Sequence, residues 1–354
     1  MGEILGIGTS HYPGPMVPDS YMAAFLRRAL ESSRVPEHLK KVESWPRPMQ
    51  LEWADDGGTR AAGKHRERMI GAFRKIRAEI EAFKPDFILV WGDDQYENFR
   101  EDIIPPFCVY IFDRAEYVPL AGIERWAKTD QNIWGEPPDK VFNIKGHVPG
   151  GRYLVNRLSQ EDFDLPYAYT LRSDRGLAHS FSQTLVFLDY DRQGFDFPLV
   201  PFHVNCYGSS VIRSRGGIAH LAGDGNEGPD PPAPSPRRCF DLGRSVARAL
   251  GESPWRVVLM ATSSWSHAFL TEKNHWLYPD MEADRQRFEE LRDGKHGSWR
   301  GLDLAQIEES GQNEILNWVC LAGAVTELNQ RIEVIDYVES HVFNSNKCFA
   351  LFRP

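Results

Sequence analysis

The sequence predicts an α/β fold, with a mostly parallel central sheet flanked by helices, and three observations support it. Residues 4–8 and 87–91 are apolar throughout, as in strands that are buried on both faces. Between them, residues 63–83 place apolar side chains at helical spacing. Strand, helix and strand in this order form a βαβ unit with parallel strands. Ligands bind such sheets beyond the carboxyl ends of the strands, so the active site is expected there.

The other helices and strands are predicted from the same two patterns, helical spacing of apolar residues and continuous apolar runs. Residues 21–30 are amphipathic and are expected to be helical, whereas residues 31–60 and 124–150 are irregular and rich in tryptophan and proline, as in loops. Further strands are expected at residues 106–112, 167–171, 198–204 and 255–261, and further helices at residues 150–158, 239–250 and 310–328. Residues 224–236, rich in glycine and proline, are expected to form a surface loop. No boundary is evident, so residues 1–354 are expected to form a single large domain.

Composition narrows the class of protein. The chain has 354 residues, is 42% hydrophobic and carries a formal net charge of -9, which suits a large core and argues against nucleic-acid binding. No apolar run approaches the roughly 18 residues that a membrane helix needs, and no signal-peptide pattern is visible. The five cysteines are scattered and form no Cys-x-x-Cys pair. A reduced, cytoplasmic protein without membrane or nucleic-acid partners is therefore expected.

Three histidines share one sequence context, in which small residues at or near a strand end precede the imidazole. They are His11 after Gly-Thr-Ser, His179 after Gly-Leu-Ala and His267 after Ser-Trp-Ser. Two imidazoles and one carboxylate with open positions form the site of non-haem Fe(II) oxygenases, which makes a metal centre a candidate. A single loop histidine is more often structural, and the spacing alone leaves several kinds of metal enzyme open.

In their order along the chain, the motifs resemble the class III extradiol ring-cleavage dioxygenases, the superfamily of the catalytic subunit of protocatechuate 4,5-dioxygenase. The resemblance lies in residues 8–11, 173–179, 201–205, 238–243, 264–267, 308–318 and 345–352. It implies that His11 and Glu314 bind iron, that His179 contacts the substrate and that His267 is the acid/base. His203 and Tyr207, in or near the motif at residues 201–205, are candidate substrate-binding residues.

One motif departs from the family pattern. The prototype has Asn-Asp-His after its second strand, and that histidine is the second imidazole ligand; here the matching residues are Asp93-Asp94-Gln95. In this motif the chain resembles the 3-O-methylgallate-cleaving branch. His65, expected in the first turn of the preceding helix, lies on the same predicted sheet edge as His11. We therefore expect His65 to replace the missing ligand; the competing hypothesis is that Gln95 binds the metal.

The resemblance implies Fe(II)-dependent extradiol cleavage of a catechol-type ring, similar to protocatechuate, gallate or methylgallate, with O2. Its partners would be a small aromatic diol and O2, and either a homo-oligomer or a separate small subunit is consistent with the sequence. Three alternatives remain open: a related metal enzyme with a different oxygenation or hydrolysis reaction, a non-catalytic partner subunit on the same fold, and a binding module without a metal. Retention of the histidines and Glu314 argues against the second alternative.

Overall fold

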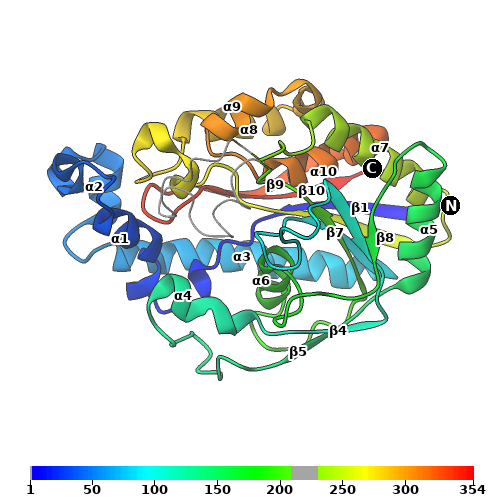
Figure 1. The fold of residues 1–354 in the computed structure, drawn as a ribbon, viewed down its shortest axis with the longest axis horizontal. Helices are drawn as coiled ribbons and strands as arrows, with labels where there is room; N and C mark the ends of the chain where they lie inside the picture. The colour runs from blue at the N-terminus through cyan, green and yellow to red at the C-terminus, as the bar shows by residue number, and fades with distance from the viewer. Residues whose placement is uncertain (1, 209–229) are drawn as a thin grey trace.

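The computed structural model describes residues 2–208 and 230–354, and a mixed eight-stranded sheet forms its centre (Figure 1). The spatial order of the strands is β6-β3-β7-β2-β8-β1-β10-β9. Their bounds are β1 Glu3–Thr9, β2 Phe87–Gly92, β3 Phe107–Tyr110, β6 Tyr167–Ala168, β7 Leu199–Val204, β8 Arg256–Thr262, β9 Arg331–Val338 and β10 Lys347–Arg353. The four central strands, β7, β2, β8 and β1, are parallel, whereas β3 and β10 pair antiparallel with their inner neighbours. The predicted α/β class with a mostly parallel sheet is thus confirmed.

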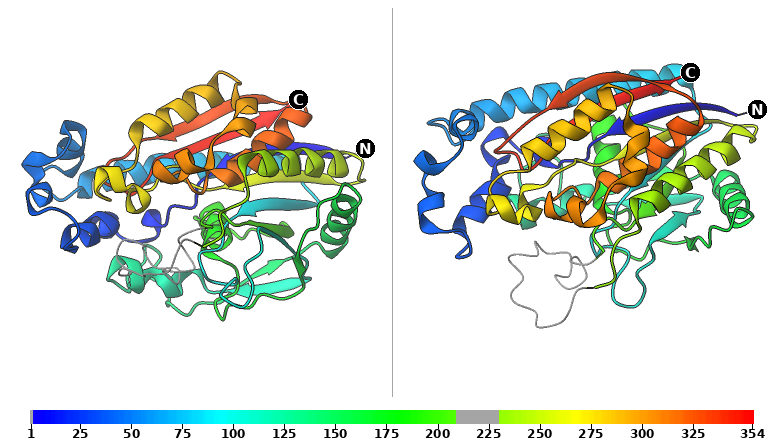
Figure 2. Two further views of the ribbon diagram at one scale, coloured as in Figure 1. Left: turned by 45° about the horizontal axis from the view of Figure 1, so that its top comes forward. Right: turned by 90° about the horizontal axis from the view of Figure 1, so that it is seen from above.

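Helices cover both faces of this sheet (Figure 2). Their bounds are α1 Ala24–Glu31, α2 Arg47–Trp53, α3 Thr59–Phe83, α4 Ile123–Ala127, α5 Val148–Ser159, α6 His179–Leu188, α7 Pro236–Gly251, α8 Met281–Arg292, α9 Leu304–Glu309 and α10 Ile315–Glu327. Alternate residues of β2 face opposite layers: Ile88 and Val90 pack with α3 and α6, and Leu89 packs with α5, α7 and α10. This two-sided burial explains why the central strands read as unbroken apolar runs.

Two segments expected to be irregular contain regular structure. Residues 31–60 include α2, because Pro48 occupies one of the first helical positions, where its missing N–H costs nothing. Residues 124–150 include most of α4 and the strand β5 (Phe142–Lys145), which pairs with β4 (Arg114–Tyr117). Of the predicted loop at residues 224–236, residues 224–229 lie outside the described part of the chain, and Pro236 begins α7. Within the described residues, no helix has the length and apolarity to cross a membrane.

The carboxyl ends of the four parallel strands lie at one edge of the sheet, facing α1 and α4 (Figure 1). Thr9 of β1 pairs with Thr262 of β8, and Gly92 of β2 pairs with His203 of β7, so these strands end in register. The next residues along each strand are therefore brought together, including His11 after β1. The N-terminus of α10, which carries Glu314, reaches the same edge and packs beside β1 and β8.

Close packing of Gly8 against Trp318 fixes α10 on β1. A Cβ atom at Gly8 would lie 2.1 Å from the Trp318 ring, whose Nε1 donates a hydrogen bond to the Ser263 carbonyl at 3.1 Å. We expect Gly8→Ala to lower the free energy of unfolding by about 1–3 kcal/mol, because the ring must move. Urea denaturation measures this loss. Gly71→Ala on exposed α3, where an added Cβ contacts nothing, is the matched control and should stabilise slightly. Equal stability of the two variants would contradict the packing argument.

Candidate active site

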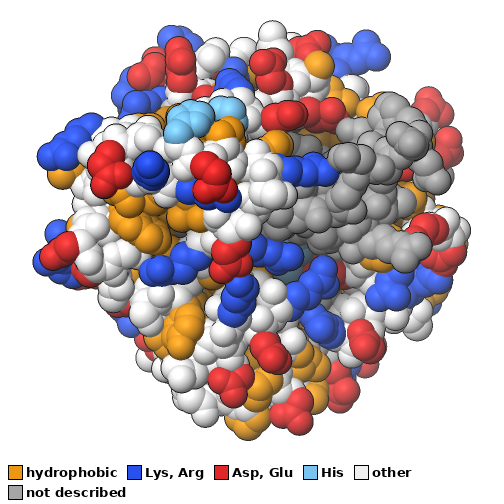
Figure 3. All heavy atoms as spheres, turned by 60° about the vertical axis from the view of Figure 1, so that its left-hand side comes forward, with side chains coloured by type: hydrophobic (Ala, Val, Ile, Leu, Met, Phe, Trp, Pro, Cys, Tyr) orange, Lys and Arg blue, Asp and Glu red, His pale blue; other side chains and the backbone are white. Residues whose placement is uncertain are grey.

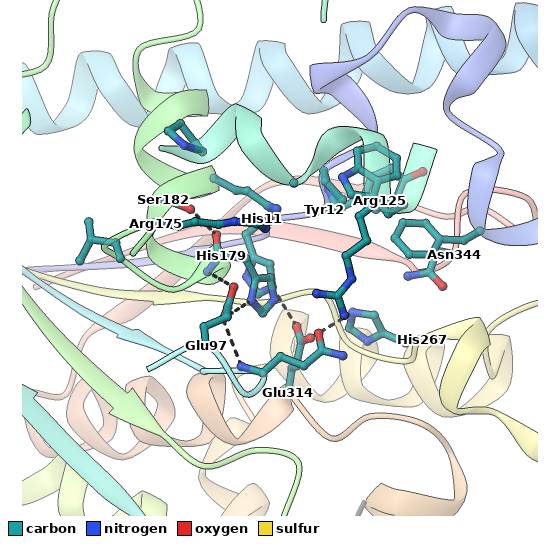
Figure 4. Close-up of a pocket in the computed structure, with 18 of the residues that line it drawn as sticks. His11, Tyr12, Glu97, Arg125, Arg175, His179, Ser182, His267, Glu314 and Asn344 are labelled. Carbon is teal, nitrogen blue, oxygen red and sulfur yellow. Dashed lines mark hydrogen bonds and ion pairs between the residues drawn. The ribbon is translucent and has the colours of Figure 1, made fainter. Parts of the chain in front are cut away.

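A cavity of about 250 Å³ opens at the carboxyl edge of the sheet, between the strand ends and the helices α1 and α4. His11, His179, His267 and Glu314 line it together (Figure 4). They come from the loop after β1, the start of α6, the loop after β8 and the cap of α10. Four segments that are distant in the sequence therefore supply one group of side chains.

His11 presents an unprotonated ring nitrogen to Glu314. Its Nδ1 lies 3.1 Å from the Thr262 carbonyl oxygen, which can only accept, so Nδ1 carries the hydrogen. Burial, and then the neighbouring His179 and His267, hold the pKa of His11 well below its usual range. The lone pair on Nε2 therefore faces Glu314 Oε2 at 3.3 Å. This tautomer, fixed by a backbone carbonyl, is the usual state of a histidine that ligates a metal.

His267 faces the other oxygen of the same carboxylate. Its Nδ1 donates to the Trp265 carbonyl at 2.8 Å, and its Nε2 lies 3.3 Å from Glu314 Oε1. Burial lowers the pKa of His267 to about 3, so the ring is neutral. Its Nε2 is thus a proton acceptor that opens into the cavity. Tyr207, one of the candidate substrate-binding residues, lines the cavity but donates its hydroxyl hydrogen to Glu314 Oε1 and so helps to hold that side chain in place.

The buried oxygens beside His11 fit a cation. Glu314 Oε2 and Asp93 Oδ2 are buried and accept no hydrogen bond from the described residues. Burial and then Asp93 raise the pKa of Glu314 well above its usual range. One proton on Glu314 would form only one hydrogen bond, so a single proton does not satisfy all the buried polar atoms at this point. The donor atoms of His11, Asp93, His179 and Glu314 all lie within 4.8 Å of one another. Imidazole nitrogens and carboxylate oxygens are ligands for divalent transition metals, so these residues fit a metal ion.

His179 is clamped by a carboxylate that the sequence did not single out. Its backbone N–H donates to Glu97 Oε1 at 2.9 Å, and its Nδ1 lies 3.0 Å from Glu97 Oε2. The other nitrogen, Nε2, lies 3.6 Å from Asp93 Oδ2. Burial opposes protonation of this ring, but Glu97, Asp93 and Glu314 together raise the pKa of His179 to about 10. Asp94, in contrast, caps the turn by accepting from the backbone of Glu97, Asn98 and Phe99.

Two predicted site residues lie away from the cavity. Helix α3 begins at Thr59, four residues earlier than expected, so His65 lies in its second turn rather than its first. Its ring packs against Tyr12 and Phe343, with centroids 5.9 and 5.0 Å away, and does not line the cavity. His203 on β7 packs its ring against Phe99 at 4.6 Å and is likewise outside the lining. These two histidines thus lie outside the cavity lining, and their proposed roles as metal ligand and substrate contact stay predictions.

Gln95, the competing candidate, does line the cavity, and its backbone N–H donates to Glu97 Oε2 at 3.2 Å.

The motif at residues 345–347 also has a physical role here. The buried Lys347 donates to the carbonyls of Phe343 and Ser345 and lies 3.8 Å over the Tyr12 ring. It thereby fixes the loop that carries Asn344 to the cavity.

An α/β fold with histidines and a carboxylate at its strand ends defines a candidate metal enzyme, and comparisons with known proteins show which enzymes it is similar to. Residues 230–350 match the family model described as the catalytic LigB subunit of aromatic ring-opening dioxygenase. Together with the relatives below, this match confirms the resemblance to the class III extradiol dioxygenase superfamily.

Three curated relatives illustrate the similarity. The 2,3-dihydroxyphenylpropionate/2,3-dihydroxicinnamic acid 1,2-dioxygenase of Photorhabdus laumondii is 24% identical over 195 residues, covering 55% of this chain and 47% of that protein. The enzyme of the same name from Paraburkholderia xenovorans is 25% identical over 290 residues, with 74% and 82% covered. Gallate dioxygenase of Pseudomonas putida is 22% identical over 216 residues, with 58% and 54% covered. The chain thus spans about half the length of the first curated relatives it matches.

Proposed function

We propose that the protein cleaves the ring of a catechol-type aromatic diol with O2, in a reaction that depends on Fe(II). The observation that carries this proposal is the convergence of His11, Glu314 and His267 in one cavity at the strand ends. His11 and Glu314 would hold the metal through Nε2 and Oε2. A bound Fe(II) ion supplies Lewis acidity, which lowers the pKa of a coordinated hydroxyl group, and open positions for its substrates. The names of the relatives support the same reaction class.

His267 is proposed as the general base. Its Nδ1 is fixed by the Trp265 carbonyl, so its Nε2 accepts a proton from the second hydroxyl of the diol without reorienting. Tyr207 donates its hydroxyl hydrogen to Glu314 Oε1, the oxygen that His267 also faces, and so keeps that carboxylate in place. For His179 the family resemblance implies contact with the substrate.

The altered motif at Asp93-Asp94-Gln95 supports a second candidate function, a different metal-dependent oxygenation or hydrolysis on the same fold. Reconstitution with Fe(II) without oxygen, followed by a panel of catechols, gallates and their methyl ethers, separates the two. Ring cleavage consumes O2 and produces a new visible absorbance. Tight metal binding without O2 uptake on any diol would favour the second candidate, whereas failure to bind metal would contradict both.

Three arginines support a substrate that carries an anionic group. Arg28, Arg125 and Arg175 line the cavity, and none of them pairs with a carboxylate of the described residues, whereas Arg66, Arg74 and Arg300 elsewhere do. Basic side chains gather near the middle of this end of the molecule (Figure 3). Phe25 and Trp126 stack with their rings 5.4 Å apart and form an apolar wall of the same cavity. Aromatic and cationic walls together suit a ring with a carboxylate substituent.

Substitution of these arginines should change substrate preference. We expect Arg125→Gln and Arg175→Gln each to lower kcat/KM for a carboxylated catechol by about 10-fold, because a charge-assisted hydrogen bond is lost, and to leave unsubstituted catechol little affected. Steady-state O2 uptake on the two substrates measures the ratio. Arg114→Gln, on β4 and outside the cavity lining, is the matched control. Equal losses on both substrates would argue against recognition of the anionic group.

A further inference from the structure

We propose that His179 supplies the second imidazole ligand of the metal, and that Glu97 holds its ring in position for that role. The inference rests on the proposed metal dependence and deepens it, because it assigns the ligand that the family motif places at the position of Gln95. It also differs from the substrate contact that the resemblance implies for His179. Three sets of contacts support it.

The first is the position of the two imidazoles. The donor atoms of His11 and His179 belong to one group with Glu314 and Asp93, and all lie within 4.8 Å of one another. Metal–nitrogen bonds of about 2.1 Å allow two ligand atoms to lie up to about 4.2 Å apart, so only a small contraction is needed. The His11 and His179 rings lie edge to face, with centroids 5.0 Å apart and planes at 84° (Figure 4). Two rings in this arrangement both reach one ion without stacking against each other.

The second is the support that Glu97 gives. Histidines that ligate a metal usually donate their other N–H to a carboxylate or carbonyl, which fixes the tautomer and the ring orientation. His11 has this partner in the Thr262 carbonyl, and His179 has it in Glu97 Oε2, while Glu97 Oε1 binds the backbone N–H of His179. Both contacts direct Nε2 of His179 toward Asp93. A metal held at this point would take the lone pair of Nε2 in place of a proton.

The third is the local sequence around Gln95. Glu97 follows Gln95 by two residues and accepts the backbone N–H of Gln95 at 3.2 Å, so the turn after β2 anchors a ligand that comes from α6. The rival candidates fit less well. The amide oxygen of Gln95 is a weak neutral ligand. His65 packs against Tyr12 and Phe343, outside the cavity lining.

Counting coordinated imidazoles tests the proposal directly. The full-length protein is loaded with Cu(II), a tightly binding probe ion, and pulsed EPR detects the remote nitrogen of each bound imidazole. We expect His179→Gln to lower the count by one and His65→Ala to leave it unchanged. Competition with a chelator, without oxygen, then gives the affinity for Fe(II). It should fall by more than about 100-fold in His179→Gln and by about 10- to 100-fold in Glu97→Gln, and it should be unaffected in His65→Ala.

Glu97→Gln keeps the ligand and removes only the charge that supports it, so it preserves the test if His179→Gln fails to fold by circular dichroism. An unchanged imidazole count in His179→Gln, an unchanged Fe(II) affinity in Glu97→Gln or a lower count in His65→Ala would overturn the proposal. The outcome is independent of turnover. A protein with His179 bound to metal but no ring cleavage would defeat only the proposed function, and an active enzyme with unchanged coordination in His179→Gln would defeat only this inference.

Discussion

Glu314→Gln is expected to abolish both metal binding and turnover. The carboxylate lies between the Nε2 atoms of His11 and His267, 3.3 Å from each, and it is 1% exposed. Glutamine keeps the shape of the side chain but removes the negative charge that offsets the charge of a cation. We expect the affinity for Fe(II) to fall by more than about 100-fold, which exceeds the loss typical of residues that only support a ligand. Metal analysis and O2 uptake on the same sample measure the two losses.

The control for this substitution is Glu309→Gln. Glu309 ends α9, only five residues before Glu314, but it is exposed and does not line the cavity. Its variant should retain full metal content and full turnover. A Glu314→Gln protein that holds iron as tightly as the wild type would contradict the assignment of Glu314. It would point instead to Asp93, whose Oδ2 is also buried and accepts no hydrogen bond from the described residues.

Much of the fold could be predicted because the central strands are buried on both faces. β2, and β8 after Arg256, appear in the sequence as apolar runs, and both strands form within one residue of the expected bounds. The sequence does not predict β9, because this strand lies at the edge of the described sheet beside β10 and most of its residues are partly or fully exposed, so it lacks the apolar signal. The start of α3 was misjudged because Gly58, with a positive φ of 85°, sets the first turn at Thr59.

The site residues could be predicted only where a local sequence pattern marks them. His11 and His267 follow small residues at strand ends, and the parallel register of β1 and β8 brings those ends together. The contact between Glu97 and His179 joins residues 82 positions apart, and no local pattern marks it. Topology predicts the sheet edge for His65, but it does not determine which way a helical side chain points. In the structure its ring faces Tyr12 and Phe343.

Loss of the proposed base should separate chemistry from metal binding. We expect His267→Gln to lower kcat by about 10²- to 10⁴-fold, the usual contribution of a general base, while the affinity for Fe(II) stays near the wild-type value. The reason is geometric: His267 faces Glu314 Oε1, whereas the group of candidate ligand atoms comprises His11, Asp93, His179 and Glu314. Pre-steady-state ring opening and metal analysis measure the two effects.

The same variant carries a prediction about pH. Burial lowers the pKa of His267 to about 3, so its ring is neutral from pH 5 to pH 8 and available as a base throughout. The ratio of wild-type to variant kcat should therefore be similar at pH 6 and pH 8. His38→Gln, on the exposed surface, is the matched control and should behave as the wild type. If His267→Gln lost iron and turnover in equal proportion, His267 would be acting as a ligand instead, because a base that does not touch the metal leaves the metal content intact.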